Sequence, residues 1–169
     1  LATAFAAGVG VPADPDRAFE LYGVGCERGD SHSCGSLGVM YSLGTGTTRD
    51  LGRAVEHFDR ACQDRDMIAC GNLGWMYLQG LGVEKSAARG TGLLTGACDE
   101  GDPRSCFRLG VHRRDDGVVS AELWRKACEL GDADACAALA VSYIDGAGVD
   151  VDEALAVELS RYGCQEGSA

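Results

Sequence analysis

The chain has 169 residues, of which 46% are hydrophobic and 7% aromatic, and its formal net charge at pH 7 is −11. This negative charge argues against a nucleic-acid backbone or an anionic membrane as the main partner, because either would repel the protein. No apolar run approaches the length of a membrane span, so we expect no membrane insertion.

Residues 1–13 show the second half of a unit that recurs along the whole chain. Phe5 stands three residues before Gly8, and the same spacing returns at three later sites: Tyr41–Gly44, Tyr77–Gly80 and Tyr143–Gly146. The first half of this unit is missing from the given residues, which contain no recognisable signal peptide. We therefore expect the sequence to be a fragment of a longer repeat array.

Cysteines mark the period of the repeat. They occur in pairs eight residues apart, and the first members stand at 26, 62, 98, 128 and 164, in steps of 36, 36, 30 and 36 residues. A fixed period of this size indicates stacked structural units. We divide the chain into four repeats with a partial repeat at each end. The partial repeats are 1–13 and 152–169, and the four repeats are 14–49, 50–85, 86–117 and 118–151.

Each repeat predicts two helices. The first begins at a capping Asp or Ser, and its small and bulky residues recur at spacings of three, four and seven, which indicates one buried helical face. The second begins at another capping aspartate and ends at a G-x-G loop. No segment alternates with period two, so we predict an all-α fold. The caps of the first helices are Asp14, Asp50, Ser86 and Asp152, and those of the second are Asp30, Asp66, Asp102 and Asp132.

Two places depart from this pattern. A glycine separates the two helices at Gly29, Gly101 and Gly131, but Arg65 takes this place in the second repeat, so we expect a different turn there. In the third repeat the G-x-G loop is missing, and Arg113 replaces the tyrosine found elsewhere. We expect residues 113–117 to form a short polar connection with a local kink or altered pitch.

In chain order, the motifs of the recurring frame are A-x7-C, G-D, C-x-x-L-G-x-x-Y and G-x-G-V. This frame resembles the Sel-1-like repeat, a relative of the tetratricopeptide repeat. With paired cysteines, the chain is most similar to the cysteine-rich secreted bacterial subset of that family. The resemblance implies a right-handed α/α superhelical solenoid that serves as a scaffold or adaptor for other proteins. It also implies an alternative, because some cysteine-rich members are described as penicillin-binding proteins with weak β-lactamase activity.

The paired cysteines favour disulfides. Within one continuous helix, residues eight apart would be about 12 Å distant, but a turn between two antiparallel helices brings them within bonding range. We expect Cys26–Cys34, Cys62–Cys70, Cys98–Cys106 and Cys128–Cys136, and therefore an extracytoplasmic location. Two alternatives stay open: zinc binding, which the scattered histidines do not favour, and reduced cysteines that pack as small apolar residues. Cys164 has no partner in the sequence.

The sequence motifs do not identify a catalytic site, a metal site or a cofactor. The serine β-lactamase, G-x-S-x-G and H-E-x-x-H signatures are absent. The G-x-G loops follow helices and are expected to close turns, and the acidic loop 145–153 lacks the order of a calcium loop. We interpret His57 as structural, and Trp75 and Trp124 as core or interface residues.

We therefore predict a disulfide-linked solenoid that binds another protein or peptide through its concave face, lined mainly by the first helices. Polar residues outside the predicted core of these helices are the candidate contacts: Glu20, Arg53, Glu56, Arg89, Thr95, Glu122 and Arg125.

Overall fold

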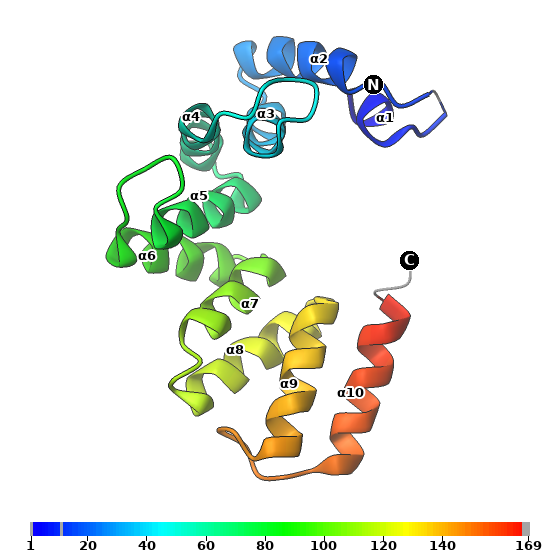
Figure 1. The fold of residues 1–169 in the computed structure, drawn as a ribbon, viewed down its shortest axis with the longest axis vertical. Coiled ribbons are helices and arrows are strands. Elements are labelled where there is room, and N and C mark those ends of the chain that lie inside the picture. Colours follow the sequence, from blue (N-terminus) through cyan, green and yellow to red (C-terminus); the bar gives the residue numbers. More distant parts are fainter. Residues whose placement is uncertain (1, 11, 167–169) are drawn as a thin grey trace. The chain divides into compact units, whose positions relative to one another are not determined.

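The computed structural model describes residues 2–10 and 12–166, with side chains up to residue 163. Over these residues the chain forms helices and loops and contains no strand (Figure 1). The helices are α1 (Ala2–Ala7), α2 (Pro15–Glu27), α3 (Ser31–Leu43), α4 (Leu51–Gln63), α5 (Met67–Gln79), α6 (Ala87–Asp99), α7 (Pro103–His112), α8 (Gly117–Glu129), α9 (Ala133–Asp145) and α10 (Glu153–Glu166).

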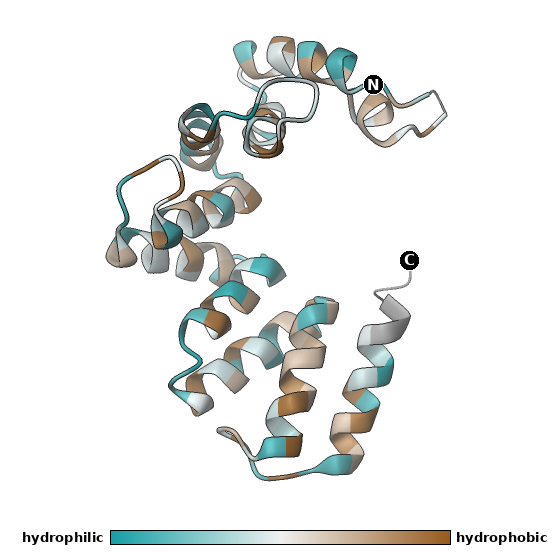
Figure 2. Ribbon diagram, in the orientation of Figure 1, coloured by the Kyte–Doolittle hydropathy of each residue, from teal (hydrophilic) through white to brown (hydrophobic). Residues whose placement is uncertain are grey.

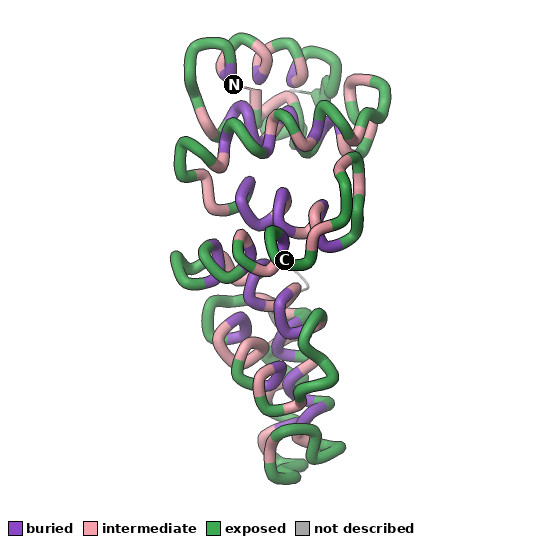
Figure 3. Tube along the Cα trace, turned by 90° about the vertical axis from the view of Figure 1, so that its left-hand side faces the viewer, coloured by how far each residue is buried: buried purple, intermediate pink, exposed green. Residues whose placement is uncertain are grey.

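The chain divides into two compact units, Leu1–Leu93 and Leu94–Ala169, with the division inside α6. In the first unit α2 packs on α3, α3 on α4, and α4 on α5; in the second, α7 packs on α8, α8 on α9, and α9 on α10. Buried and exposed residues alternate along the helices (Figure 3), as do hydrophobic and hydrophilic ones (Figure 2). Each unit is therefore built by packing each helix against its neighbours in sequence.

The small residues predicted at the buried face of the first helices are buried in the structure. Ala18 and Ala54 are 0% exposed, and Ser120 and Ala156 are each 2% exposed. Small side chains at these positions let the next helix approach closely. In the first unit, the larger core residues Leu37, Phe58 and Leu73 pack around them.

The predicted capping aspartates are confirmed, and Ser86 accepts from the Arg89 N–H at a longer 3.4 Å. The Asp14, Asp50 and Asp152 carboxylates accept hydrogen bonds from the backbone N–H three residues later, at 2.9–3.0 Å. The caps of the second helices do the same, at 2.8–3.1 Å: Asp30, Asp66, Asp102 and Asp132.

The G-x-G loops use both glycines. The first glycine ends a second helix in the left-handed region, with φ of 76° at Gly44 and 72° at Gly80. The second lies against the start of the first helix of the same repeat: a Cβ on Gly46 would come within 2.3 Å of the Pro15 carbonyl oxygen. The loop therefore folds back onto the hairpin that precedes it.

The prediction of a different turn at Arg65 is wrong. Arg65 has φ of 65°, in the same left-handed region as Gly29, Gly101 and Gly131. Its N–H donates to Cys62 O and that of Asp66 donates to Ala61 O, a pattern found in the glycine turns as well. The hydrogen bonds fix the turn, and arginine adopts an unfavourable backbone conformation to fit it.

The connection between α7 and α8 is short, as expected. Helix α7 has 10 residues, whereas α3, α5 and α9 have 13, and it ends at a capping Arg113 with φ of −100°. Asp116 then accepts from the Val119 N–H and caps α8. Asp116 was not among the predicted caps.

Candidate functional site

Four disulfides join the two helices of successive hairpins: Cys26–Cys34, Cys62–Cys70, Cys98–Cys106 and Cys128–Cys136. The Cα atoms of each pair are 4.6–4.8 Å apart, within the range that a disulfide requires. Cys62 is half-buried and the other seven are buried. The side chain of Cys164 lies outside the described residues.

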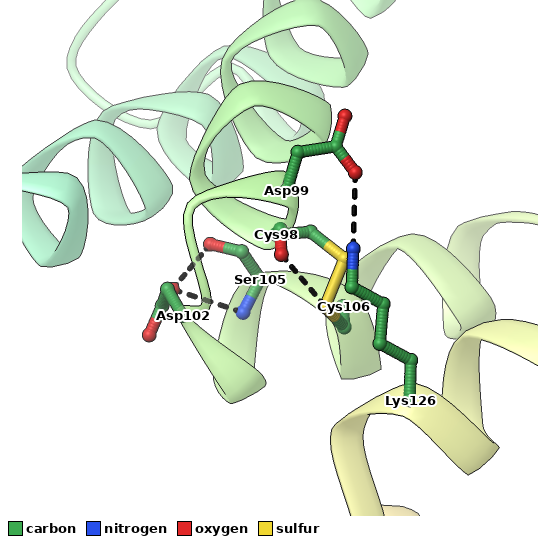
Figure 4. The surroundings of a disulfide bond; sticks show 6 residues. All are labelled: Cys98, Asp99, Asp102, Ser105, Cys106 and Lys126. Carbon is green, nitrogen blue, oxygen red and sulfur yellow. Dashed lines mark hydrogen bonds and ion pairs between the residues drawn. A yellow bond between two sulfur atoms is a disulfide. The ribbon is translucent and has the colours of Figure 1, made fainter. Parts of the chain in front are cut away.

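Figure 4 shows how one hairpin is held around its disulfide. Asp102 accepts hydrogen bonds from the Ser105 backbone N–H and from the Ser105 hydroxyl, and this cap starts α7 beside the Cys98–Cys106 bridge. On the other side, Lys126 Nζ of α8 donates to Asp99 Oδ1 at 3.0 Å. The bridge, the cap and the ion pair together fix where α6 ends and α7 begins.

His57 packs in an aromatic cluster next to the first disulfide. Its ring stacks on Tyr41 with centroids 5.3 Å apart, and Phe19 meets the same tyrosine edge-on. The Nδ1 atom lies 3.9 Å from Cys26 Sγ. Burial lowers the pKa of His57 below the ordinary value of 6.5. These contacts support the interpretation of His57 as a structural residue.

Three of the seven candidate binding residues are arginines bonded to tyrosine hydroxyls. Arg53 donates to Tyr41 at 3.3 Å and Arg89 to Tyr77 at 3.5 Å, and each guanidinium lies 5.6 Å from the centre of the tyrosine ring. Arg125 donates to the Tyr143 hydroxyl at 3.2 Å. In each case the arginine lies on a first helix and the tyrosine on a second. These arginines therefore connect helices within the fold.

The other four candidates are exposed, as are Arg53 and Arg89, whereas Arg125 is half-buried. Glu20 forms an ion pair with Arg17 at 2.6 Å on α2. Glu56 lies three residues from Arg53 on α4, and Glu122 three residues from Arg125 on α8, so each pair shares a helix face. Thr95 lies on α6.

Sequence reasoning missed a hollow on the second helices. A pocket of about 130 Å³ lies between α3 and α5, two helices that contact each other. It is open to solvent and mostly apolar, and Ile68 beside it is 63% exposed. The lining residues are His32, Gly35, Ser36, Val39, Asp66, Ile68, Ala69 and Asn72.

Small residues on α3 create this hollow. Gly35 packs closely on α5, since a Cβ there would lie 3.2 Å from Asp66 Oδ2 and 3.6 Å from Ala69 Cβ. In the repeat frame, Phe107 and Arg108 of α7 occupy the positions of Gly35 and Ser36, and both are half-buried. Two adjacent small residues on a second helix were the sequence signal for the hollow.

The second unit has a different charge at the position where the first unit has the hollow, because Arg108 of α7 stands there. Burial, and then the positive charge of Arg104, lower the pKa of the Arg108 guanidinium, while Asp102 and Asp132 act in the opposite direction. In the hollow of the first unit, Asp66 is the only acidic lining residue and no lysine or arginine is present.

The described residues contain no group of three or more His, Cys, Asp or Glu side chains that could hold a metal ion. No helix in the described part of the chain combines the length and the apolar character needed to cross a membrane.

Five segments of the chain match the Sel1 repeat: 1–30, 31–66, 68–102, 103–132 and 133–168. The segment 31–66 groups α3 with α4, whereas our division groups α2 with α3. The division into 14–49, 50–85, 86–117 and 118–151 stays a prediction. No curated protein is significantly similar to the chain.

Solved structures with Sel1 repeats share the fold. A Sel1 repeat protein from Oxalobacter formigenes has a TM-score of 0.85 at 22% identity, over 98% of this chain and 68% of that chain. The protective antigen c5321 of uropathogenic Escherichia coli has a TM-score of 0.81 at 27% identity, over 98% of this chain. This chain spans only 37% of the length of that antigen. The cysteine-rich protein B of Helicobacter pylori has a TM-score of 0.52 at 27% identity, over 55% of this chain and 70% of that chain.

Proposed function

The chain belongs to the Sel1 repeat family, and we propose that it is a scaffold that binds another protein or a peptide. Sel1 repeats generally mediate protein interactions. Within each unit, stacked hairpins supply similar side-chain positions on neighbouring helices, which suits a peptide partner.

We place the binding surface on the second helices. The observation that carries this choice is the apolar hollow between α3 and α5, because exposed apolar surface next to a pocket is typical of interaction sites. In the same unit, Leu43 of α3 is a further exposed apolar residue on a second helix. The arginines on the first helices already bond to tyrosines within the protein, which makes them less available to a partner.

The partner is expected to carry basic groups. The chain has a net charge of −11, and complementary charge speeds association and disfavours acidic competitors. The four disulfides support an oxidising, extracytoplasmic compartment, secreted or periplasmic, as the place where this scaffold works.

A peptide selection tests the proposal and the position of the surface. A displayed library of random dodecapeptides is selected on the immobilised, oxidised protein. Enriched peptides should bind the wild-type protein and lose affinity with Ile68→Asp, while Glu56→Ala, Thr95→Ala and Glu122→Ala leave binding unchanged. If these three variants lose binding and Ile68→Asp keeps it, the binding surface lies on the first helices. Failure to enrich any peptide counts against the scaffold function.

The β-lactam activity implied by the family resemblance stays a separate hypothesis. Turnover of a chromogenic β-lactam by the pure protein tests it directly, and no residue of this structure has been assigned to that reaction.

A further inference from the structure

We propose that the hollow between α3 and α5 holds one aliphatic side chain of a partner protein, next to a lysine or arginine of the same segment that pairs with Asp66. This inference rests on the proposed scaffold function and defines the side chains that its surface selects.

The size and walls of the hollow favour an aliphatic occupant. Its volume is about 130 Å³, and a dry cavity of roughly 150 Å³ binds a molecule as large as benzene. Val39, Ile68 and Ala69 supply apolar walls from both helices. Burying a leucine or isoleucine side chain here would also cover Ile68, which is otherwise 63% exposed.

The charge at the rim favours a basic neighbour. One carboxylate oxygen of Asp66, Oδ1, accepts the Ala69 N–H at 2.9 Å, and the other, Oδ2, faces Gly35 of α3. No lysine or arginine lines the hollow, and His32 is the one lining residue that can carry a positive charge. A lysine or arginine beside the aliphatic side chain would supply that charge at a solvent-accessible site.

The second unit shows how the repeat fills the corresponding position. Phe107 and Arg108 bring a ring and a guanidinium to the positions of Gly35 and Ser36. The partner's aliphatic and basic side chains would therefore bring one apolar and one basic group to the first unit, as Phe107 and Arg108 do in α7.

The test uses three acetylated, amidated tetrapeptides: Gly-Leu-Lys-Gly, Gly-Leu-Gln-Gly and Gly-Ala-Lys-Gly. Each is titrated into the oxidised ¹⁵N-labelled protein, and amide shifts are followed by NMR. The Leu-Lys peptide should shift the amides of Gly35, Val39, Ile68 and Ala69. The Ala-Lys peptide should bind at least roughly tenfold more weakly, because three carbons are removed from the apolar contact. The Leu-Gln peptide should bind about two- to fivefold more weakly, the range for an exposed ion pair.

Two variants of the protein, with one control variant, separate the apolar contact from the charged contact in peptide binding. Ser36→Leu fills the hollow from α3 and should abolish the shifts, whereas Gln79→Leu, an exposed change at the end of α5, should leave them intact. Asp66→Asn keeps a side chain that can cap α5 and should remove the preference for Leu-Lys over Leu-Gln. The ¹⁵N spectrum of each variant, compared with wild type, reports that the fold is retained.

Equal affinity of the Ala-Lys and Leu-Lys peptides, or unchanged binding to a folded Ser36→Leu variant, overturns the proposal. So does self-association of the wild-type protein that Ser36→Leu abolishes, since the occupant would then be a second copy of the chain. If the selected dodecapeptides bind wild type and Ser36→Leu equally, the scaffold function is supported, but the proposal that the hollow binds a partner side chain is wrong. If no peptide binds either protein, the scaffold function itself fails.

Discussion

The junction between α3 and α4 and the junction between α7 and α8 solve the same packing problem differently. In the first, Tyr41 is 8% exposed and contacts Phe19, His57 and Arg53, and a loop with two glycines follows it. In the second, Arg113 stands at the tyrosine position, and the loop is absent.

The α7–α8 junction lacks the tyrosine and also lacks the arginine that bonds to it in the α3–α4 junction. Arg53 corresponds in the repeat frame to Val119, so the tyrosine, the arginine and the loop disappear from the same junction. Ring packing on the glycine of the second helix is retained. A Cβ on Gly38 would lie 2.6 Å from the Phe58 ring, and one on Gly110 would lie 2.3 Å from Trp124 Nε1. The aromatic–glycine contact is thus the shared element of both junctions, and the tyrosine–arginine contact accompanies the long loop.

The largest expected difference between the junctions comes from Tyr41→Ala and Arg113→Ala. Removing the buried tyrosine should lower the free energy of unfolding by about 3 to 5 kcal/mol, the range for a buried aromatic side chain. Removing the exposed arginine should change it by less than about 0.5 kcal/mol. Urea unfolding of the oxidised proteins measures both, and a similar cost for the two variants would contradict the comparison.

The Cys62–Cys70 bridge between α4 and α5 and the Cys98–Cys106 bridge between α6 and α7 should stabilise the protein equally. Cys62→Ser and Cys98→Ser each open a bridge with a sequence separation of 8, so each should cost about 2 to 4 kcal/mol in oxidised protein. In reduced protein both substitutions should have little effect. Equal losses with and without reductant would show that the cysteines stabilise through packing and not through the crosslink.

Arg65 and Gly101 provide a smaller and reciprocal test. Arg65→Gly should raise the free energy of unfolding by about 0.5 to 1 kcal/mol, because it relieves a left-handed conformation that costs about 1 to 2 kcal/mol, less the entropy of glycine. Gly101→Arg should lower it by a similar amount, since a Cβ at Gly101 meets nothing within 4 Å and only the backbone is strained. Thermal unfolding midpoints that move in the same direction for both variants would refute this account.

The smallest effect is the pH dependence contributed by His57, which has no counterpart in the second junction. Burial lowers the pKa of His57 in the folded protein, so the folded state binds this proton less readily than the unfolded state. Its contribution to stability should be present above about pH 6.5 and should decrease as the pH falls through the unfolded pKa. Urea unfolding at several pH values should show a shallower dependence for His57→Gln than for wild type, and an unchanged dependence would rule out this contribution.

Much of the fold could be predicted because local signals and the repeat agreed. Capping aspartates, the small residues on the buried faces and the spacing of the cysteines all specify short-range structure. Arg65 was misjudged for a physical reason: hydrogen bonds from the Arg65 and Asp66 N–H groups to carbonyls at the end of α4 determine the turn, and they outweigh the preference of one residue. Asp116 was missed because the caps were placed by their distance from the G-x-G loop, which this junction lacks; counted from the cysteine, Asp116 precedes Cys128 by the same twelve residues as Asp50 precedes Cys62.

The candidate site was harder to predict. Arg53, Arg89 and Arg125 read as polar residues outside the core, and nothing in their own helices showed that tyrosines one helix away would bond to them. The hollow depends on Gly35 and Ser36 lying opposite Ala69 and Asn72, a contact between α3 and α5 that are separated by a whole helix. Such contacts depend on how hairpins stack, and the sequence specifies this only indirectly.

The short span of each disulfide has a consequence for how the protein matures. Eight cysteines allow about 105 pairings, yet each native bridge joins residues only 8 apart, across a single capped turn. Closing a short loop costs less entropy than closing a long one, so each cysteine meets its native partner more often than any other. Oxidation can therefore proceed hairpin by hairpin as the chain emerges, with little need for an isomerase to correct mispaired bridges.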